Sequence, residues 1–371
     1  MPAQLLDRLE RRLPAAPRLW IPKHVLVTRA AADLPHTAEI LRRAEAFGVD
    51  DIRLLPADRL PTAPKGESER EAYARAKATM AVVVAPPSAL KPQPIPPSAD
   101  WRLDLARGCP AHCQYCYLAG SLSGAPITRV HANLDEVLAP IASLTGTGSV
   151  TTGDALRGRE GTTFELSCYT DPLGIEHLTG SLAAAIAQVG TGRHGDGASL
   201  RFTTKFDAVE PLLALPHGGR TRIRFSLNAA EVERFEGGTA RMPARIEALR
   251  RVSEAGYPVG LTIAPVMPVD GWQESYGRLL DDVAAALAGI PDLDLTAEVI
   301  THRFTPSSKQ VLEGWYPRTK LEMDESVRSV KRSKFGGVKY VYPKGTMSDL
   351  RSWFEREVPG RLPGARLLYS T

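Results

Sequence analysis

Cysteine is scarce in this sequence of 371 residues, and its few copies are unevenly placed. Only four cysteines occur, and three of them, Cys109, Cys113 and Cys116, fall within eight residues. Cysteines so close together cross-link no distant segments, so the pattern argues against a secreted protein held by disulfides. It favours a reducing compartment and a metal site.

Long apolar runs are also lacking. No stretch approaches the roughly 18 apolar residues of a transmembrane helix. The N-terminus, MPAQLLDRLERRL, mixes acids with bases where a signal peptide would have an apolar core. We therefore expect a cytoplasmic protein with no membrane contact.

Charge of one sign is not in strong excess. The formal net charge of +4 is far from that of a basic tail, so any contact with nucleic acid must come from a local patch. With 43% hydrophobic residues, the chain is long enough for one large domain or two ordinary ones, each with its own core.

The first part of the chain is predicted to form a small α/β region over residues 1–84. Its pattern indicates a strand at 24–28 and helices at 37–47 and 67–80. Residues 85–98, APPSALKPQPIPPS, hold six prolines in fourteen residues. Proline excludes a regular helix or a central strand there, so we expect a linker that leads into a second unit over 99–371.

Beyond this linker, short β-rich runs alternate with helical patterns. Six strands are predicted, at 101–106, 163–168, 199–205, 222–228, 259–266 and 295–303. Helices are predicted between them at 134–144, 176–189, 243–255 and 272–288. Regular βα alternation is typical of a parallel sheet. Six units are two short of a closed barrel, so we expect an open, partial (β/α)6 TIM-type barrel.

In such barrels, chemistry collects at the C-terminal ends of the strands. Six residues with useful chemistry or position lie at or just past these ends: Cys109, Cys168, Lys205, Ser226, Ala264 and Arg303. The sequence therefore predicts one shared site.

The cysteine triplet lies in RGCPAHCQYCYL, directly after the first barrel strand. The CxxxCxxC spacing lets three thiolates converge from one loop, and thiolates are the ligands that iron–sulfur clusters require. Three cysteines leave the fourth iron of a four-iron cluster open to a small molecule. The alternatives are a structural cluster, buried free thiols, or a zinc site completed by His112 or Cys168.

Several longer motifs occur in order around this triplet. They are GCPAHCQYCYL, SCYTDPLGIEHLTGSL, RFTTKF, RFSLN, GYPVGLTIAPV followed by GW, THRFT and KFGGVKYVY. Over about residues 100–345, this set resembles the spore photoproduct lyases. These are radical S-adenosylmethionine enzymes that repair the methylene-bridged thymine dimer of ultraviolet-irradiated spore DNA.

The resemblance implies a role for each matching residue. The cofactors would be a 4Fe-4S cluster on Cys109, Cys113 and Cys116, and S-adenosyl-L-methionine held by Tyr115, Thr170, Asp171, Lys205, Ser226 and Ala264. Cys168 matches the hydrogen-atom donor, Tyr115 and Tyr117 match tyrosines that return the radical, and Arg303 would contact the lesion. Thr170 departs from the serine expected at its position but keeps the hydroxyl.

The implied function is a DNA-repair lyase that reverts spore photoproduct to two thymines. A 5′-deoxyadenosyl radical takes a hydrogen from C6 of the lesion and the methylene bridge breaks. The allylic thymine radical then needs a hydrogen atom, which the thiol of Cys168 gives up readily. Tyrosine can quench the resulting thiyl radical because its phenolic O–H is also a hydrogen donor. We expect a monomer that uses an external electron donor of the flavodoxin or ferredoxin type.

The stretch 331–344, KRSKFGGVKYVYPK, has five basic residues, three aromatics and no acid. Gly336 and Gly337 stand where a hairpin turn would be. Because the lesion must be extruded from the duplex, we expect this basic hairpin to contact UV-damaged DNA. The residues concerned are Lys331, Arg332, Lys334, Lys339 and Tyr340, for phosphate contact and base stacking. A basic hairpin can also be plain solvated surface.

Two other functions stay open on the sequence. One is a radical enzyme acting on a different nucleic-acid lesion, on RNA or on a small molecule, because fold and cluster do not determine the substrate. The other is a nucleic-acid binding module stabilised by zinc or a cluster. Single residues also have plainer roles: Cys168 as a small buried hydrophobe, Lys205, Asp171 and Ser226 in a structural hydrogen-bond network, and Arg303 in an ion pair.

Overall fold

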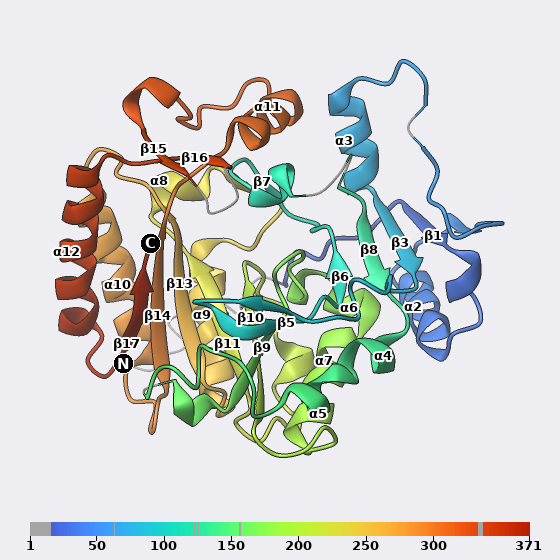
Figure 1. The fold of residues 1–371 in the computed structure, drawn as a ribbon, viewed down its shortest axis with the longest axis horizontal. Helices are drawn as coiled ribbons and strands as arrows, with labels where there is room; N and C mark the ends of the chain where they lie inside the picture. Colours follow the sequence, from blue (N-terminus) through green and yellow to red (C-terminus); the bar gives the residue numbers. More distant parts are fainter. Residues whose placement is uncertain (1–15, 63, 122–123, 125, 156, 333–336) are drawn as a thin grey trace, which may run out of the picture.

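The structure is a computed structural model that describes residues 16–62, 64–121, 124, 126–155, 157–332 and 337–371. Two sheets dominate it, a five-stranded sheet in the order β2-β1-β3-β8-β6 and an eight-stranded sheet in the order β17-β14-β13-β11-β10-β9-β5-β4. Figure 1 shows them side by side, the smaller sheet at the right and the curled larger sheet at the left and centre.

The smaller sheet is parallel except for its last strand. Its strands are β1 (His24–Val27), β2 (Ile52–Leu54), β3 (Thr79–Val83), β6 (Ala106–Arg107) and β8 (Thr128–His131), of which β6 alone runs antiparallel, against β8. Helices α2 (Pro35–Ala46) and α3 (Glu69–Lys77) belong to the same part of the chain. A capping box between Ser68 and Glu71 starts α3.

The helix predicted at 67–80 is too long at its C-terminal end. It stops at Lys77, and Thr79–Val83 forms the strand β3, almost wholly buried between β1 and β8. The β-branched residues Thr79, Val82 and Val83 suit a buried strand, and the tertiary context decides against the helical pattern.

The proline-rich segment contains one short strand. Gln93–Ile95 forms β4, which pairs antiparallel with β5 (Ala99–Arg102) at the edge of the large sheet. Edge positions tolerate proline because one side of the strand needs no ladder hydrogen bond. The small sheet also takes β6 and β8 from beyond residue 98, so it is built from two separated parts of the chain. The division at 84 and 98 stays a prediction.

The large sheet is the expected open, partial barrel. Its six central strands run parallel in chain order and are β5, β9 (Thr162–Glu165), β10 (Ala198–Thr204), β11 (Thr221–Leu227), β13 (Val259–Val266) and β14 (Leu295–Thr301). β17 (Arg366–Ser370) adds a further parallel strand beside β14. The first barrel strand begins and ends earlier than predicted, because residues 106–107 belong to β6 in the other sheet.

Helices cover the outer face of this barrel. They are α4 (Leu134–Leu138), α5 (Pro140–Leu144), α7 (Ser181–Gly190), α9 (Met242–Glu254), α10 (Trp272–Leu287) and α12 (Lys344–Arg361). Helix α6 (Glu176–Thr179) instead contacts α2, and its Leu178 lies in the core of the smaller sheet. Two predicted helices are each broken in two. Pro140 starts α5 as a separate helix, and Gly180, with φ +63°, separates α6 from α7.

Alternation along each strand sorts the side chains into two layers. Phe164, Leu200, Phe202, Ile223 and Phe225 are fully buried in the main hydrophobic core, and burial of each contributes roughly 1.5–3 kcal/mol. The residues between them point to the barrel interior, because successive side chains on a strand face opposite sides. By this alternation, the interior-facing rows of side chains on β10, β11 and β13 end at Lys205, Ser226 and Ala264.

Charged side chains, not apolar ones, fill much of the barrel interior. Arg201 Nη2 lies 2.5 Å from Glu298 Oε1, and Arg224 Nη1 lies 2.7 Å from Glu298 Oε2 and also pairs with Glu165. All four side chains are at most 3% exposed. Buried ion pairs of this kind add little net stability, but each fixes its partner's geometry because an unpaired buried charge is costly.

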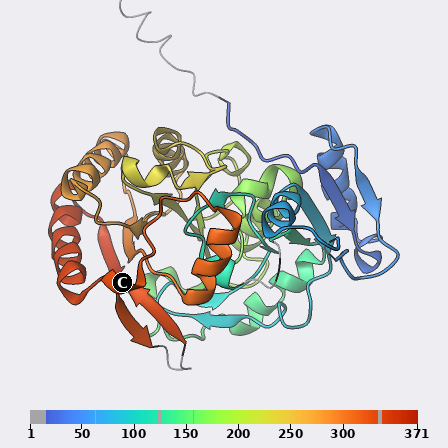
Figure 2. The ribbon, with the colours of Figure 1, turned by 90° about the horizontal axis from the view of Figure 1, so that it is seen from above.

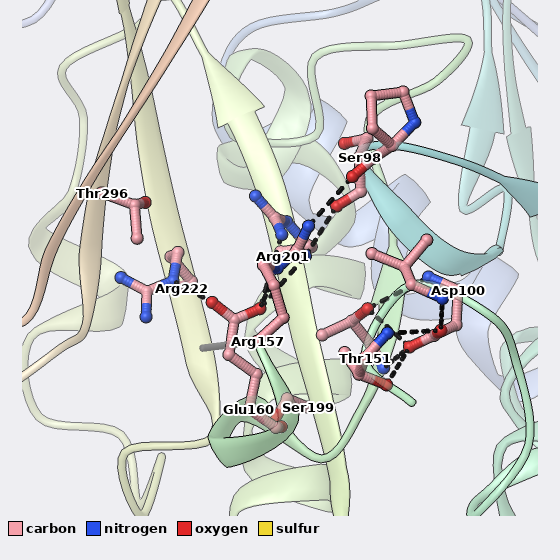
Figure 3. A network of polar contacts seen from close by, with 12 residues as sticks. Ser98, Asp100, Thr151, Arg157, Glu160, Ser199, Arg201, Arg222 and Thr296 are labelled. Atoms are coloured by element: carbon pink, nitrogen blue, oxygen red, sulfur yellow. Dashed lines mark hydrogen bonds and ion pairs between the residues drawn. The ribbon is translucent and has the colours of Figure 1, made fainter. Parts of the chain in front are cut away.

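The network continues to the N-terminal ends of the strands, as Figure 3 shows. Glu160 lies between three guanidinium groups, with Arg157 Nη2 at 3.1 Å, Arg222 Nε at 3.4 Å and Arg201 Nη1 at 3.5 Å. Arg157 also donates to the carbonyls of Pro97 and Ser98 at 2.9 Å, and so ties the proline-rich segment to the barrel.

Short elements lie over the C-terminal ends of the strands. They are β7 (His112–Cys113) paired with β12 (Glu236–Gly237), α8 (Ala230–Glu233), α11 (Pro306–Trp315), and the antiparallel pair β15 (Ser329–Arg332) and β16 (Val338–Val341). Figure 2, viewed from above, shows α11 in orange over the middle of the molecule with α3 in blue beside it. Within the described residues, no helix is long and apolar enough to cross a membrane.

Candidate active site

The cysteine loop is held to the barrel mouth by backbone pairing. Cys113 stands in β7 opposite Glu236 of β12, and Gln114 N donates to Phe235 O at 2.9 Å. At the start of the loop, Gly108 adopts φ +93°, and its N–H donates to the carbonyl of Tyr169 at 2.8 Å. A side chain at Gly108 would place Cβ 2.3 Å from the carbonyl oxygen of Ile127, so only glycine fits this turn.

The three loop cysteines line one small cavity. Its other lining residues come from α3, α11 and the loop itself and are Tyr73, Lys77, Ala111, Leu118, Pro126, Trp315 and Tyr316. The ammonium of Lys77 donates to the carbonyls of Cys109, at 2.6 Å, and Ala111, at 2.5 Å. This buried lysine therefore fixes the backbone between the first two cysteines.

Burial keeps the loop thiols protonated when no metal is bound. It raises the pKa of Cys109 to about 11 and that of Cys113 to about 12, and the pKa of Cys116 is raised as well. Metal binding must displace these protons, because thiolates are the ligands. Among the described residues, no three His, Cys, Asp or Glu side chains are grouped closely enough for a single metal ion. A cluster places each thiolate on a different iron.

Lys205, at the end of β10, is the centre of a second group. Its ammonium lies 2.6 Å from the hydroxyl of Tyr115 and 2.6 Å from Glu236 Oε1, and 3.5 Å from the carbonyl of Ala264. Tyr115 in turn donates to Glu236. On its other side, Glu236 Oε2 lies 2.6 Å from Arg245 Nη1, and both of these side chains are fully buried.

Two cations stabilise the charged form of Glu236. Burial alone would raise the pKa of this carboxyl, but Lys205 and Arg245 outweigh burial and bring the pKa below its usual value. Arg245 is itself held by the carbonyls of Ala240 and Ser226 and by Thr239 Oγ1. The Lys205 ammonium is thus held in place by its counter-ion Glu236, which Arg245 fixes in turn.

The other predicted cofactor residues surround Lys205. Asp171 Oδ2 accepts from the backbone N–H of Lys205 at 2.7 Å, and burial raises the pKa of Asp171 to about 6. Ser226 donates to the carbonyl of Ala264 at 3.2 Å. Thr170 is 5% exposed, and its hydroxyl oxygen is buried with no hydrogen-bond partner in the described parts of the chain.

Cys168 follows β9 and is joined to the cysteine loop through Tyr117. The hydroxyl of Tyr117 donates to the carbonyl of Cys168, although the tyrosine ring is largely exposed. Burial, with Glu165 and Asp104 near, raises the pKa of the Cys168 thiol. The two predicted radical tyrosines therefore have different neighbours, since Tyr115 lies in the Lys205 group and Tyr117 lies beside Cys168.

Arg303 and the basic strands lie at the outer rim of the mouth. Arg303 is exposed at the end of β14, with no hydrogen bond or ion pair to the residues described here. The next residue, Phe304, exchanges two backbone hydrogen bonds with Tyr340 of β16, and the two rings stack 5.2 Å apart. Lys331 and Lys339 stand directly opposite each other in β15 and β16. Arg332 is exposed, and Lys334 lies outside the described residues.

Sequence reasoning missed several residues of this site. Glu236, Arg245, Lys77, Tyr73 and Trp315 lie far along the chain from the cysteine motif, and each stands in an ordinary helical or loop pattern. One weak signal pointed to a residue such as Glu236: a buried lysine is expected to have an acidic partner, and Lys205 was a predicted cofactor residue.

A cavity of about 670 Å³ lies at the opposite end of the barrel. Glycines and charged side chains at the N-terminal ends of the strands line it, among them Glu160, Arg222 and Asp294. None of the four cysteines is among its lining residues. Active sites of parallel barrels form at the C-terminal ends of the strands, so the cysteine loop is the candidate site.

An open parallel barrel with a three-cysteine loop at its mouth and the predicted cofactor lysine beside it is typical of the radical S-adenosylmethionine enzymes. Comparison with known sequences agrees and narrows the class. The sequence model of the family described as spore photoproduct lyase matches residues 20–371. The chain belongs to this family.

Curated relatives cover nearly the whole chain. A spore photoproduct lyase from Geobacillus sp. (strain Y412MC61) is 37% identical over 353 residues, which cover 95% of this chain and 99% of the relative. That from Bacillus subtilis (strain 168) is 36% identical with the same coverage. One from Clostridium acetobutylicum is 32% identical over 335 residues, 90% of this chain and 94% of the relative.

Solved structures give the same result. A spore photoproduct lyase complexed with dinucleoside spore photoproduct matches with a TM-score of 0.84 at 36% identity, over 95% of this chain and 100% of the other. A mutant with bound AdoMet and dinucleoside spore photoproduct matches equally well, with the same TM-score, identity and coverage. The expected family membership and the α/β partial-barrel fold are confirmed, and the chain is a lyase.

Proposed function

We propose that this chain reverts the spore photoproduct of damaged DNA to two thymines by radical S-adenosylmethionine chemistry. Family membership supports the reaction class, because the relatives are named spore photoproduct lyase and a neighbouring structure holds dinucleoside spore photoproduct. One contact in this chain carries the proposal furthest. The hydroxyl of Tyr117, next to the last loop cysteine, donates to the carbonyl of Cys168 and so joins the cluster loop to the proposed hydrogen donor.

The residues present fit both cofactors. Cys109, Cys113 and Cys116 line one cavity from a single loop, which suits a 4Fe-4S cluster. When bound, the cluster and S-adenosylmethionine supply a 5′-deoxyadenosyl radical, a reagent that no side chain can provide.

Lys205 would hold the methionine carboxylate. Its ammonium lies 2.6 Å from Glu236 Oε1 and can pair with a second carboxylate at close range. The hydroxyl of Thr170 is buried without a partner among the described residues, so it has a free donor and acceptor for the cofactor. The rest of the S-adenosylmethionine site would be formed by Asp171, Ser226 and the backbone of Ala264, with Tyr115 at one side.

Cys168 would end the radical on the substrate. A hydrogen-atom donor must carry its hydrogen at working pH, and the raised pKa of the Cys168 thiol keeps it protonated. The thiol S–H breaks as the thymine C–H forms, which leaves a thiyl radical on Cys168. Tyr117 then gives its phenolic hydrogen to the sulfur, and Tyr115, on the other side of Cys116 in the sequence, would continue the return of the radical to the cofactor.

DNA binding would use the rim formed by Arg303 and the basic strands. Lys331 and Lys339 are like charges in directly opposed positions, an unfavourable pair unless an anion lies between or near them. A phosphate backbone supplies such anions. We propose that Arg332 and Tyr340 contribute to the same surface, with Arg303 nearest the lesion, and that Lys334, which lies outside the described residues, also contacts the DNA. We further propose a cytoplasmic monomer that takes electrons from an external protein donor.

The test is repair by anaerobically reconstituted protein with S-adenosylmethionine and dithionite. We expect thymine product from dinucleoside spore photoproduct and none from a cyclobutane dimer. Iron and sulfide are measured on the same sample, and colourless protein holding one zinc would end the proposal. With Cys168→Ala, 5′-deoxyadenosine should still form while clean thymine product falls and side products appear. An unchanged product distribution would remove Cys168 from its role.

Tyr117→Phe tests the second hydrogen transfer. Repair should slow while formation of 5′-deoxyadenosine without lesion stays unchanged, because only the hydroxyl beside Cys168 is lost. Tyr257→Phe is the matched control, since its hydroxyl also donates to a backbone carbonyl, that of Leu212, away from the site. Equal effects of the two substitutions would mean that the Tyr117 hydroxyl is structural.

A further inference from the structure

Three aromatic side chains form a wall outside the cysteine loop. Tyr73 comes from α3, and Trp315 and Tyr316 lie at the end of α11. All three line the same cavity as the loop cysteines. Tyr73 is 6% exposed, whereas Trp315 and Tyr316 are only half-buried, so the wall reaches from the cavity to the surface.

These rings are in direct contact with one another and with the loop. The rings of Trp315 and Tyr73 stack with centroids 4.7 Å apart and planes 26° apart. The Tyr73 hydroxyl hydrogen-bonds to the Tyr316 hydroxyl and lies 3.1 Å from His112 Nδ1. His112 directly precedes Cys113 in β7. Conjugated groups therefore lead from a partly exposed indole to a cluster cysteine.

The proposed function requires an electron to enter at this loop. Cys113 is only 9% exposed, and Cys109 and Cys116 are half-buried, so the loop offers a protein donor little thiol surface. A docked donor must place its redox centre against whatever group lies between the loop and solvent.

We propose that Trp315, stacked on Tyr73, is the docking point through which an acidic flavin or iron–sulfur protein delivers its electron to the cysteine loop. The inference rests on the proposed function. The donor protein loses one electron and is oxidised, and the cluster gains that electron and is reduced. No bond forms or breaks.

Charge around Trp315 favours an acidic partner. Apart from the buried Lys77, residues 65–77 and 306–320 carry six cations, Lys65, Arg70, Arg75, Lys309, Arg318 and Lys320. They face five carboxylates, Glu67, Glu69, Glu71, Glu313 and Glu325, the last of which pairs with Lys309 at 3.6 Å, so the excess is one positive charge. The formal charge of the whole chain is +4. Arg70, Arg318 and Lys320 are exposed, and none of them forms an ion pair within the part of the chain that the structure covers. Complementary charge steers such encounters and raises their rate.

The experiment compares two reductants on the reconstituted holoenzyme. Bleaching of the visible absorbance follows cluster reduction, with either dithionite or a bacterial flavodoxin in its hydroquinone form as the donor. Isothermal titration gives the affinity for flavodoxin. Dithionite is small and needs no docking surface, so it separates loss of docking from damage to the cluster.

Trp315→Leu keeps apolar volume but removes the ring. Because buried tryptophans are common binding hot spots, we expect flavodoxin affinity and the second-order reduction rate to fall about tenfold or more. Trp315→Phe keeps a ring on Tyr73, and its loss should stay within about threefold. Reduction by dithionite should slow much less than reduction by flavodoxin, because dithionite needs no docking surface. Arg318→Glu with Lys320→Glu should slow flavodoxin at low salt, and high salt should abolish the difference.

Trp272→Leu is the matched control, because Trp272 is also half-buried and contacts another ring, that of Trp353, but on α10 outside the barrel. It should behave as wild type with both reductants. Equal slowing of Trp315→Leu with dithionite and flavodoxin would overturn the proposal, as would no slowing with either. Repair driven by dithionite tests the proposed function separately, since it bypasses the docking surface.

Discussion

Glu236→Gln is the substitution that most directly tests the group around Lys205. Glutamine keeps the shape of the side chain but removes its charge. In the wild-type protein, the Glu236 carboxylate lies 2.6 Å from Lys205 and 2.6 Å from Arg245. Removing one partner of a buried ion pair costs about 3–5 kcal/mol, because the remaining charges stay buried and uncompensated. Since Arg245 is fully buried and Lys205 keeps other partners, we expect about 3 kcal/mol less free energy of unfolding at pH 7.

The pH dependence carries a definite sign. The pKa of Glu236 is lower in the folded protein than the ordinary value of 4.5, so its stabilising contribution is present above that value. It is lost as the pH falls through the folded pKa. The stability difference between wild type and Glu236→Gln should therefore be full at pH 7 and shrink toward acid pH.

Urea unfolding of the metal-free protein, followed by tryptophan fluorescence from pH 4 to 8, is the assay, because it needs neither cofactor. The control is Glu247→Gln, whose carboxylate pairs with Arg250 on the surface of α9. Exposed pairs contribute about 0–1 kcal/mol. If Glu236→Gln costs no more than Glu247→Gln at pH 7, the buried group does not hold Lys205 as described. The holoenzyme variant should also bind S-adenosylmethionine about tenfold more weakly.

Three further variants have definite expected results. Glu176 accepts backbone N–H groups at the start of α7, and burial raises its pKa to about 7; ionisation is unfavourable, so stability is lost as pH rises from 4.5 to 7. Glu176→Gln should flatten that loss of about 3 kcal/mol in thermal melts, and parallel profiles would contradict it. Lys331→Gln with Lys339→Gln should lower the slope of log affinity for lesion duplex against log salt by about two, measured by fluorescence anisotropy; an unchanged slope would place DNA elsewhere. Gly108→Ala should cost about 2 kcal/mol or more and reduce bound iron, because of its φ of +93° and the 2.3 Å contact; normal iron content would show that the loop adjusts.

Much of the barrel was predictable because its signals are local. Five of the six predicted strands lie within a few residues of β9, β10, β11, β13 and β14, since β-branched runs and turn residues repeat along the chain. The errors have physical causes. Thr79–Val83 follows a helix without a break in the pattern, and its burial between β1 and β8 depends on strands distant in sequence.

The candidate site also has features that the sequence predicts and features that it does not. CxxxCxxC, the position of Cys168 past β9 and the strand-end positions of Lys205, Ser226 and Ala264 are all visible in the sequence. The contacts that complete the site are not visible in the sequence. Tyr115 and Glu236 are 121 residues apart, and Tyr73 and Tyr316 are 243 apart, so no local pattern indicates either pair.

The amino-acid sequence by itself determined the open barrel, the cysteine loop and the family, because each depends on spacing and order along the chain. Tertiary structure decided which charges face each other in the barrel interior, which acid holds Lys205, how β6 and β8 complete the small sheet, and which rings cover the cysteine loop. The physical reason is that burial leaves each charged or polar group needing a partner, and folding alone determines which distant residue is close enough to be that partner.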